Sequence, residues 1–183
     1  MSTLDNRPNK ALIVIDMQIG VVRDAYEIDD VTSTIQGLVA KARQADVPVV
    51  WVQDHAEDRA IDSDDWQLVD GLDPLAGEPR VGKAFGDAFA DTDLEAVLAD
   101  RGVGELVLVG AASEQCVRCT MHSAVVRGYD VALVKGGHST TDLTSYGMPE
   151  PGVVVGFMDM VAAFGMQWPG RAGRSVTPDD VGF

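Results

Sequence analysis

The chain has only two cysteines among its 183 residues, and it has no long apolar run. Two cysteines cannot build a disulfide scaffold, and so low a number is typical of a compartment in which thiols stay reduced. No apolar stretch is long enough to span a bilayer, and the polar segment Met1–Lys10 lacks the apolar centre of a signal peptide. These absences predict a cytoplasmic protein with no membrane partner.

Basic residues are also scarce, because 14 lysines and arginines face 29 aspartates and glutamates and give a net charge of −15. Binding to a phosphate backbone needs a basic stripe, so this composition predicts no nucleic-acid partner. An acidic field favours a small cationic substrate. A solvated acidic surface that only keeps the protein soluble explains the same charge, and the charge alone leaves both readings open.

The remaining composition, with 46% hydrophobic and 23% charged residues, fits one globular domain over residues 1–183. Short apolar runs rich in β-branched residues predict strands that are covered on both faces. Helical spacing of apolar residues predicts helices between and after these strands. The strands are expected at 11–15, 48–52, 106–109 and 130–134, and the helices at 31–45, 92–101, 113–127 and 151–164. This alternation predicts an α/β fold with a mostly parallel sheet.

Three further segments carry weaker patterns. Residues 54–82 are rich in Asp, Gly and Pro, and we expect a long loop with a short helical piece near 66–69. The tail from Gly165 is expected to wrap the surface. The helix expected at 151–164 is apolar nearly all round, which predicts a homo-oligomer, a dimer or tetramer, that covers its outer face.

Cys116 stands where a buried strand passes into a helix. The strand at 106–109 is followed by the small residues Gly110, Ala111 and Ala112, and Ser113 is a good N-cap residue. Cys116 would then be the third helical residue, where the helix dipole favours a nucleophilic thiolate. An inert, buried cysteine fits the same pattern.

Two other charged residues are candidates to act with Cys116. Asp16 directly follows the strand at 11–15, at the edge of a parallel sheet where ligands bind. Lys83 lies in a stretch of small and aromatic residues at 81–89, and beside Cys116 and Asp16 it would lower the pKa of both. A turn aspartate and a solvated surface lysine are the alternatives.

Motifs in a fixed order connect these residues. They are Val14-Ile15-Asp16-Met17-Gln18, Lys83 with Phe89-x-x-Thr92-x-Leu94, Gly110-x-x-Ser113-x-x-Cys116-Val117-x-x-Thr120, Gly128-Tyr129-Asp130-Val131 and His138-Ser139-Thr140-Thr141. Together they resemble the isochorismatase-like cysteine hydrolase superfamily over about residues 10 to 164. The resemblance implies a three-layer α/β/α, Rossmann-like fold.

The resemblance also implies a catalytic triad of Asp16, Lys83 and Cys116. Cys116 would attack an amide carbonyl to form a thioester, Asp16 would transfer the protons, and Lys83 would hold both charges in place. In the superfamily a non-proline cis peptide shapes the turn, and it maps to Ala111–Ala112. The N–H groups of Ala112 and Cys116 would then form the oxyanion hole.

This sequence departs from the superfamily pattern in the residues around two of its histidines, His55 and His138. Nicotinamidases of the superfamily bind a metal through Asp-x-His and a second histidine downstream. Here His55 directly follows Asp54, and no other histidine occurs before His122, so we expect no metal, no other cofactor and a substrate other than nicotinamide. Gly136-Gly137-His138 stands where many members have Asp-Ala-His, and we expect His138 to be a structural hydrogen-bonding residue rather than a catalytic one.

The resemblance favours cleavage of a C–N bond in a small amide, lactam or ureide. True isochorismatases cleave a vinyl ether in an anionic substrate and do not always have the cysteine, so Cys116 and the acidic surface make that activity the alternative. Streptothricin hydrolases, which open a lactam in a cationic antibiotic, offer one concrete model. The expected pocket residues are Gln18, Trp51, Asp54, Trp66, Phe85 and Phe89, although the aromatic residues also suit a core.

Two other classes compete with a hydrolase. Cys116-Val117-Arg118-Cys119 is a C-x-x-C motif at a helix start, which is typical of thiol redox proteins. That interpretation leaves Asp16 and Lys83 without a role. A non-catalytic binding protein on the same scaffold is the third alternative.

Overall fold

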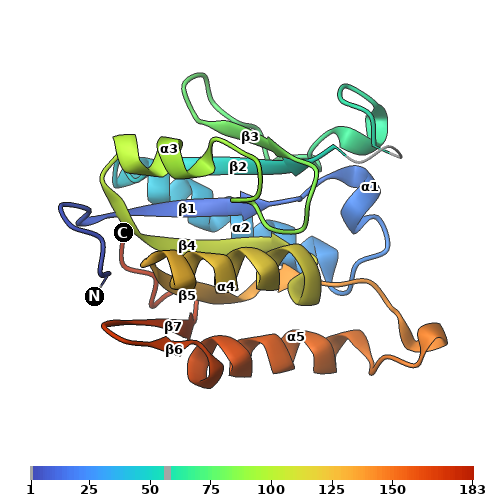
Figure 1. Cartoon of the computed structure of the whole chain (residues 1–183). Helices are drawn as coiled ribbons and strands as arrows, with labels where there is room; N and C mark the ends of the chain where they lie inside the picture. Colours follow the sequence, from blue (N-terminus) through green and yellow to red (C-terminus); the bar gives the residue numbers. More distant parts are fainter. Residues whose placement is uncertain (1, 56–58) are drawn as a thin grey trace.

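The computed structural model describes residues 2–55 and 59–183, and it has a central sheet between two helical layers (Figure 1). The strands are β1 (Asn9–Ile15), β2 (Val49–Asp54), β3 (Arg80–Lys83), β4 (Val103–Ala111), β5 (Asp130–Ser139), β6 (Gln167–Trp168) and β7 (Arg171–Val176). Their order across the sheet is β3-β2-β1-β4-β5-β7-β6. All neighbours pair in parallel except β6 and β7, which confirms the predicted α/β fold with a mostly parallel sheet.

In the part of the chain that the structure describes, five α-helices and several shorter turns connect the strands. The helices are α1 (Ile19–Val22), α2 (Ile28–Gln44), α3 (Leu94–Asp100), α4 (Arg118–Arg127) and α5 (Pro151–Met160). The 3₁₀ turns are η1 (Asp64–Trp66) and η3 (Thr144–Tyr146), and the π-helical turns are η2 (Ser113–Val117) and η4 (Val161–Gly165). The α-helices agree with the predicted ones, except that α1 was not expected.

The two faces of the sheet support separate apolar cores. On one face, buried residues of α3, α4 and α5 such as Leu98, Met121 and Met158 pack on the sheet. On the other face the cover comes from α2, through Ile35, Leu38 and other buried residues. Because strand residues alternate between the faces, strands covered on both sides show the continuous apolar runs that predicted them.

Two parts of the sheet were not predicted. β3 lies in the segment expected to be a loop, and β7 lies in the tail expected to wrap the surface. β3 pairs with β2, and β7 pairs with β5. Both strands are short and have few apolar residues. The only large apolar residue is Val81 in β3 and Val176 in β7. Strands away from the centre of a sheet need no continuous apolar run, so periodicity did not reveal them.

The predicted helix starts are partly wrong. Thr92 and Glu95 have the spacing of a capping box but do not form one. The Thr92 hydroxyl donates to the Ala88 carbonyl and accepts from the Leu94 N–H, and the Glu95 carboxylate binds Arg7. The short helical piece falls at η1 rather than at 66–69. At the C-terminal end of α4, Gly128 takes the left-handed conformation that suits a glycine after a helix, with φ of +111°.

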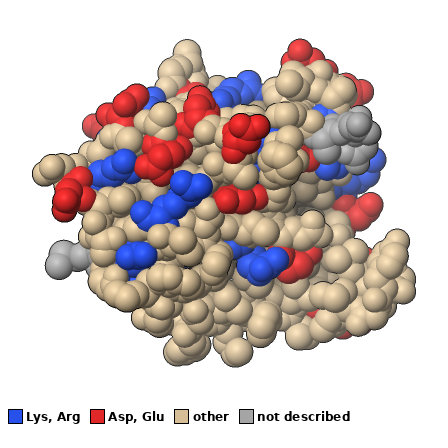
Figure 2. Space-filling model, in the orientation of Figure 1, with Lys and Arg blue, Asp and Glu red and all other residues tan. Residues whose placement is uncertain are grey.

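Helix α5 leaves an apolar face uncovered in the single chain. Val153, Phe157 and Met160 of α5, together with Phe164 of η4, are each more than half exposed. Figure 2 shows few charged side chains over this lower part of the molecule. Within the described residues, no helix is both long and apolar enough to cross a membrane.

Candidate active site

The carboxyl ends of neighbouring strands bring the predicted catalytic residues together. Asp16 follows β1, Lys83 ends β3, and Cys116 lies in η2 directly after β4. Gly110 near the end of β4 has φ of +121°, and a side chain there would begin 2.0 Å from the carbonyl oxygen of Ile15. Only glycine permits this close approach of β4 to the end of β1.

Lys83 lies between the carboxylate and the thiol. Its Nζ atom is 2.7 Å from Oδ2 of Asp16 and 3.3 Å from Sγ of Cys116. Asp54 at the end of β2 is a more distant third neighbour, with Oδ1 3.8 Å from the same nitrogen. The side chains of Lys83 and Asp16 are essentially without solvent exposure, so this cluster of charges is held by protein contacts alone.

The pKa values of the cluster correct one prediction. Burial raises the pKa of Cys116 to about 12, and the negative charge of Asp16 adds to the rise, while Lys83 opposes it. Burial also raises the pKa of Asp16 against the lowering effect of Lys83. The expectation that Lys83 leaves both pKa values below their ordinary range was wrong, because desolvation outweighs the attraction. The resting thiol is therefore protonated.

Lys83 itself stays charged. Burial alone would lower the pKa of its ammonium group, but the charge and hydrogen bond of Asp16, with smaller effects of Cys116 and Asp54, raise it on balance. Oδ1 of Asp16 has no hydrogen-bond partner within the described residues. The site thus holds a fixed cation beside a protonated thiol and a carboxylate oxygen that is able to accept a proton.

The turn before Cys116 has the predicted cis peptide bond, between Ala111 and Ala112. The predicted role of Ser113 as an N-cap was wrong, because Ala112 takes the N-cap position and the Ser113 side chain is fully buried. The hydroxyl of Ser113 pairs with His138 instead. Ala112 and Cys116, which were predicted to form the oxyanion hole, both line the cavity at the site.

This cavity has a volume of about 390 Å³, within the range of small-molecule sites. Of the six predicted pocket residues, Asp54 and Phe85 line it. Sequence reasoning missed Arg59, whose guanidinium binds Asp54 at 2.8 Å, and several residues from loops. The lining residues are Asp16, Gly20, Val21, Asp54, Arg59, Lys83, Ala84, Phe85, Gly86, Ala112, Gln115, Cys116 and Thr141.

Gln18 and Trp51 have structural positions rather than positions in the pocket. The fully buried Gln18 amide donates to the carbonyls of Asp54 and Trp66, and it accepts from the Asp54 N–H. Trp51 is fully buried in the core on the α2 side, where its indole N–H donates to Glu78. Strand alternation directs Trp51 away from the site, so its predicted contact with a substrate was wrong.

The two remaining aromatic residues pack elsewhere. The ring of Trp66 lies under the guanidinium of Arg80, at 5.3 Å from its centroid. Phe89 is 6% exposed and packs against Tyr129, with ring centroids 5.7 Å apart. Neither aromatic ring lines the cavity beside Cys116. Of these two residues, Phe89 belongs to the core, whereas Trp66 is partly exposed and packs on Arg80.

The histidines and Cys119 lie outside the Asp16–Lys83–Cys116 cluster. His122 packs edge-on against Trp168, at 5.3 Å between ring centroids. Among the residues that the structure describes, no group of three or more potential ligands is arranged to hold a metal ion. Both cysteines are free thiols, and the sulfur of Cys119 lies against Gly86.

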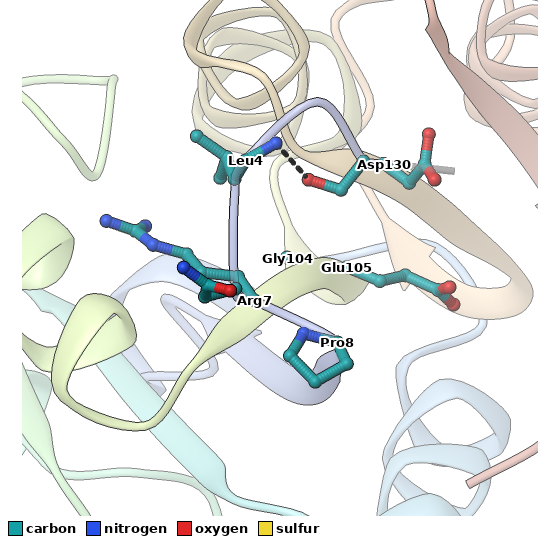
Figure 3. Close-up of a pocket in the computed structure, with 8 residues that line it drawn as sticks. Leu4, Arg7, Pro8, Gly104, Glu105 and Asp130 are labelled. Carbon is teal, nitrogen blue, oxygen red and sulfur yellow. Dashed lines mark hydrogen bonds between the residues drawn. The ribbon is translucent and has the colours of Figure 1, made fainter.

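A second and larger cavity, of about 570 Å³, lies at the opposite end of the sheet (Figure 3). Gly104 and Glu105 near the start of β4, Asp130 at the start of β5 and Arg7 from the N-terminal segment line it. Arg7 donates to Glu95 at 2.8 Å and to the Tyr129 hydroxyl at 2.7 Å. Its described lining residues include no cysteine, lysine or histidine, so this cavity offers no comparable chemistry.

The fold and the cluster together define an α/β protein with a candidate nucleophilic cysteine at the carboxyl edge of a parallel sheet. Residues 10–148 match the family model described as "Isochorismatase domain". The chain therefore belongs to the isochorismatase family.

Two similar proteins of this family have names that state an activity. A streptothricin hydrolase of Streptomyces noursei is 36% identical over 143 residues, covering 75% of this chain and 57% of that protein. The ureidoacrylate amidohydrolase RutB of Enterobacter sp. (strain 638) is 26% identical over 179 residues, covering 70% of this chain and 78% of that protein. The chain thus spans little more than half the length of the streptothricin hydrolases that it matches.

A solved structure agrees over nearly the whole chain. The crystal structure of a putative isochorismatase hydrolase from Oleispira antarctica is 26% identical, with a TM-score of 0.81 over 98% of each chain. The similarity extends beyond residue 148 and so includes α5 and the last strands.

Proposed function

We propose that this protein hydrolyses a C–N bond in a small amide, lactam or ureide through a thioester on Cys116. The observation that carries the proposal is the position of Lys83, whose Nζ lies 2.7 Å from the Asp16 carboxylate and 3.3 Å from the Cys116 sulfur. A nucleophile, a proton acceptor and a fixed cation in contact are what nucleophilic acyl transfer requires.

In the first half of the reaction, the thiol proton passes to the Asp16 carboxylate as the sulfur attacks the carbonyl carbon. The high pKa of the thiol makes this base necessary, because few thiolates exist at neutral pH. The N–H groups of Ala112 and Cys116 stabilise the developing oxyanion. The C–N bond then breaks, and protonated Asp16 gives its proton to the leaving nitrogen.

In the second half, water replaces the released amine or ammonia beside Asp16. The carboxylate takes a proton from this water as its oxygen attacks the thioester carbon. The C–S bond breaks, the acid product leaves, and the sulfur regains a proton from Asp16. Lys83 keeps its charge throughout and balances whichever of Asp16 and Cys116 is negative.

The names of two relatives support this substrate class. One is named for hydrolysis of streptothricin and another for hydrolysis of ureidoacrylate as an amide. For this chain, lactams and ureides are therefore the first compounds to test, beside simple amides. The acidic net charge of −15 favours cationic members of each set.

A screen of such compounds for release of amine or ammonia tests the proposal, with Cys116→Ala as the matched variant. We expect turnover by the wild-type protein and none above background by Cys116→Ala, with the melting temperature unchanged. Turnover near the wild-type rate by Cys116→Ala would refute the nucleophile.

Cys119→Ser separates the hydrolase from the thiol redox alternative in the same screen. A hydrolase keeps most of its activity in this variant, because Cys119 lines no part of the cavity. A C-x-x-C redox catalyst loses its activity.

A further inference from the structure

A chain of buried polar side chains lies behind the turn that carries Cys116. His138 on β5 is 1% exposed, and its Nδ1 is 2.8 Å from the hydroxyl oxygen of Ser113. Ser113 is the first residue of η2 and stands between Ala112 and Cys116 in the sequence. The proposed reaction makes no direct use of either side chain, although both are fully buried polar groups next to its oxyanion site.

The other nitrogen of His138 faces a carboxylate. Its Nε2 lies 3.5 Å from Oδ1 of Asp159 on α5, and that oxygen accepts a hydrogen bond of 2.6 Å from the Ser175 hydroxyl on β7. Burial alone would raise the pKa of Asp159, but His138 and Ser175 lower it on balance, so the carboxylate is ionised at neutral pH. Three separate elements of the fold therefore converge behind the cysteine turn.

The carboxylate sets the direction of the hydrogen bond to Ser113. At 3.5 Å the contact with Asp159 is electrostatic, and Nε2 has no hydrogen-bond partner within the described residues, but the negative charge opposite it favours the neutral tautomer of His138 that has its proton on Nε2. Nδ1 then presents a lone pair, and the Ser113 hydroxyl must donate to it. This fixes the rotation of the Ser113 side chain, and with it the first residue of the π-helical turn.

The backbone of β5 is shaped to place His138 at this point. Leu108 of β4 pairs with Leu133, but Gly110, two residues later, pairs with His138, so β5 bulges over residues 134–137. Gly136 in the bulge has φ of +68°, and a side chain on Gly137 would begin 2.9 Å from Val109. The register shift of β5, with the two glycines in its bulge, places the imidazole of His138 beside η2.

We propose that His138, aligned by Asp159, is a positioning residue that holds Ser113 and thereby the oxyanion-binding N–H groups of the turn. The inference rests on the proposed function, since it assigns these N–H groups a role in the reaction. The transition state needs the N–H geometry more than the bound substrate does, so loss of the anchor lowers kcat rather than raising KM.

Steady-state kinetics on single variants test this role. We expect His138→Phe and Ser113→Ala to lower kcat by about 10–100-fold, less than the loss of about 100–1,000-fold when an oxyanion donor itself is removed, with KM changed by less than about threefold. His138→Asn, whose amide keeps a polar group toward Ser113, should recover part of the loss. His122→Phe is the matched control, because that histidine packs on Trp168 away from the site.

Hydrogen exchange gives a second measurement that needs no substrate. Amides of residues 112–117 should exchange faster in His138→Phe than in the wild type, while those of α2 on the far face stay unchanged. Uniformly faster exchange, or kcat within twofold of wild type in both His138→Phe and Ser113→Ala, would overturn the positioning role. Failure of the proposed function is read separately, as turnover that survives Cys116→Ala.

Discussion

The two ends of the central sheet each carry a cavity, and they differ in how their polar groups are paired. At the amino end Arg7, which lines the larger cavity (Figure 3), forms an ion pair with Glu95 and donates to the Tyr129 hydroxyl. At the carboxyl end the smaller cavity holds a protonated thiol and a buried carboxylate oxygen without a partner in the described chain. Cavity volume therefore does not identify the site, whereas buried groups that lack a partner do.

The largest effect is expected from breaking the ion pair at the carboxyl end. Lys83→Met leaves the buried Asp16 without its cation, which should cost about 3–5 kcal/mol in the free energy of unfolding and abolish turnover. Urea denaturation measures the first effect, and the substrate screen measures the second.

The double variant Asp16→Asn/Lys83→Met sharpens this result. Without either charge, the penalty of an unpaired buried ion disappears, so most of the lost stability should return while activity stays absent. Equal destabilisation in the single and double variants would show that the pair is not coupled.

The pH dependence of kcat/KM should also reflect the carboxyl end. Asp16 must be ionised to accept the thiol proton, and burial raises its pKa, so activity should fall on acidification at a pH above the ordinary value of 3.8. The pKa of Cys116, about 12, predicts no increase in rate near pH 9, where an ordinary thiol ionises. A clear step near pH 9 would contradict the neutral resting thiol.

At the amino end, the expected effect is on stability alone. Arg7→Ala removes hydrogen bonds to Glu95 and to the buried Tyr129, and it should cost about 1–3 kcal/mol in the free energy of unfolding. The value of kcat/KM should stay within about twofold of wild type. A large loss of activity with a normal melting temperature would mean that this cavity takes part in the reaction.

The smallest effect on activity is expected from the outer face of α5, which lies at neither end of the sheet. We propose that a second copy of the chain covers the exposed Phe157 and its apolar neighbours. Phe157→Glu should then shift the mass measured by light scattering toward the monomer, with little change in activity per chain. A monomeric wild type at micromolar concentration would refute this interface.

The central strands and the cluster could be predicted because their signals are local. Buried parallel strands show as apolar runs, and Asp16, Lys83 and Cys116 each lie in a motif. Arg59, Gly20 and Val21 lie outside the predicted helices and strands and outside the motifs, and nothing in the sequence indicated that they line the cavity. The raised pKa values also depended on burial, which only the assembled structure reveals.

The error on Trp51 has a simple physical origin. Val50 and Val52 face the core on the side of α3 and α4, whereas Val49 and Trp51 face the opposite core. Side chains alternate between the two faces of a sheet, so the face to which a residue points decides whether it can contact a substrate. Its distance from a motif along the chain does not.

The central position of β1 beside β4 has a consequence for how the molecule folds. Asp16 and Cys116, the proposed proton acceptor and nucleophile, follow adjacent strands, yet α1, α2, β2, β3 and α3 separate them along the chain. Pairings between such distant segments form slowly, because a long loop must close before any contact compensates. A growing chain that has emerged from the ribosome only as far as α3 thus contains Asp16 and Lys83 but not Cys116, and the proposed site is complete only once β4 has paired beside β1.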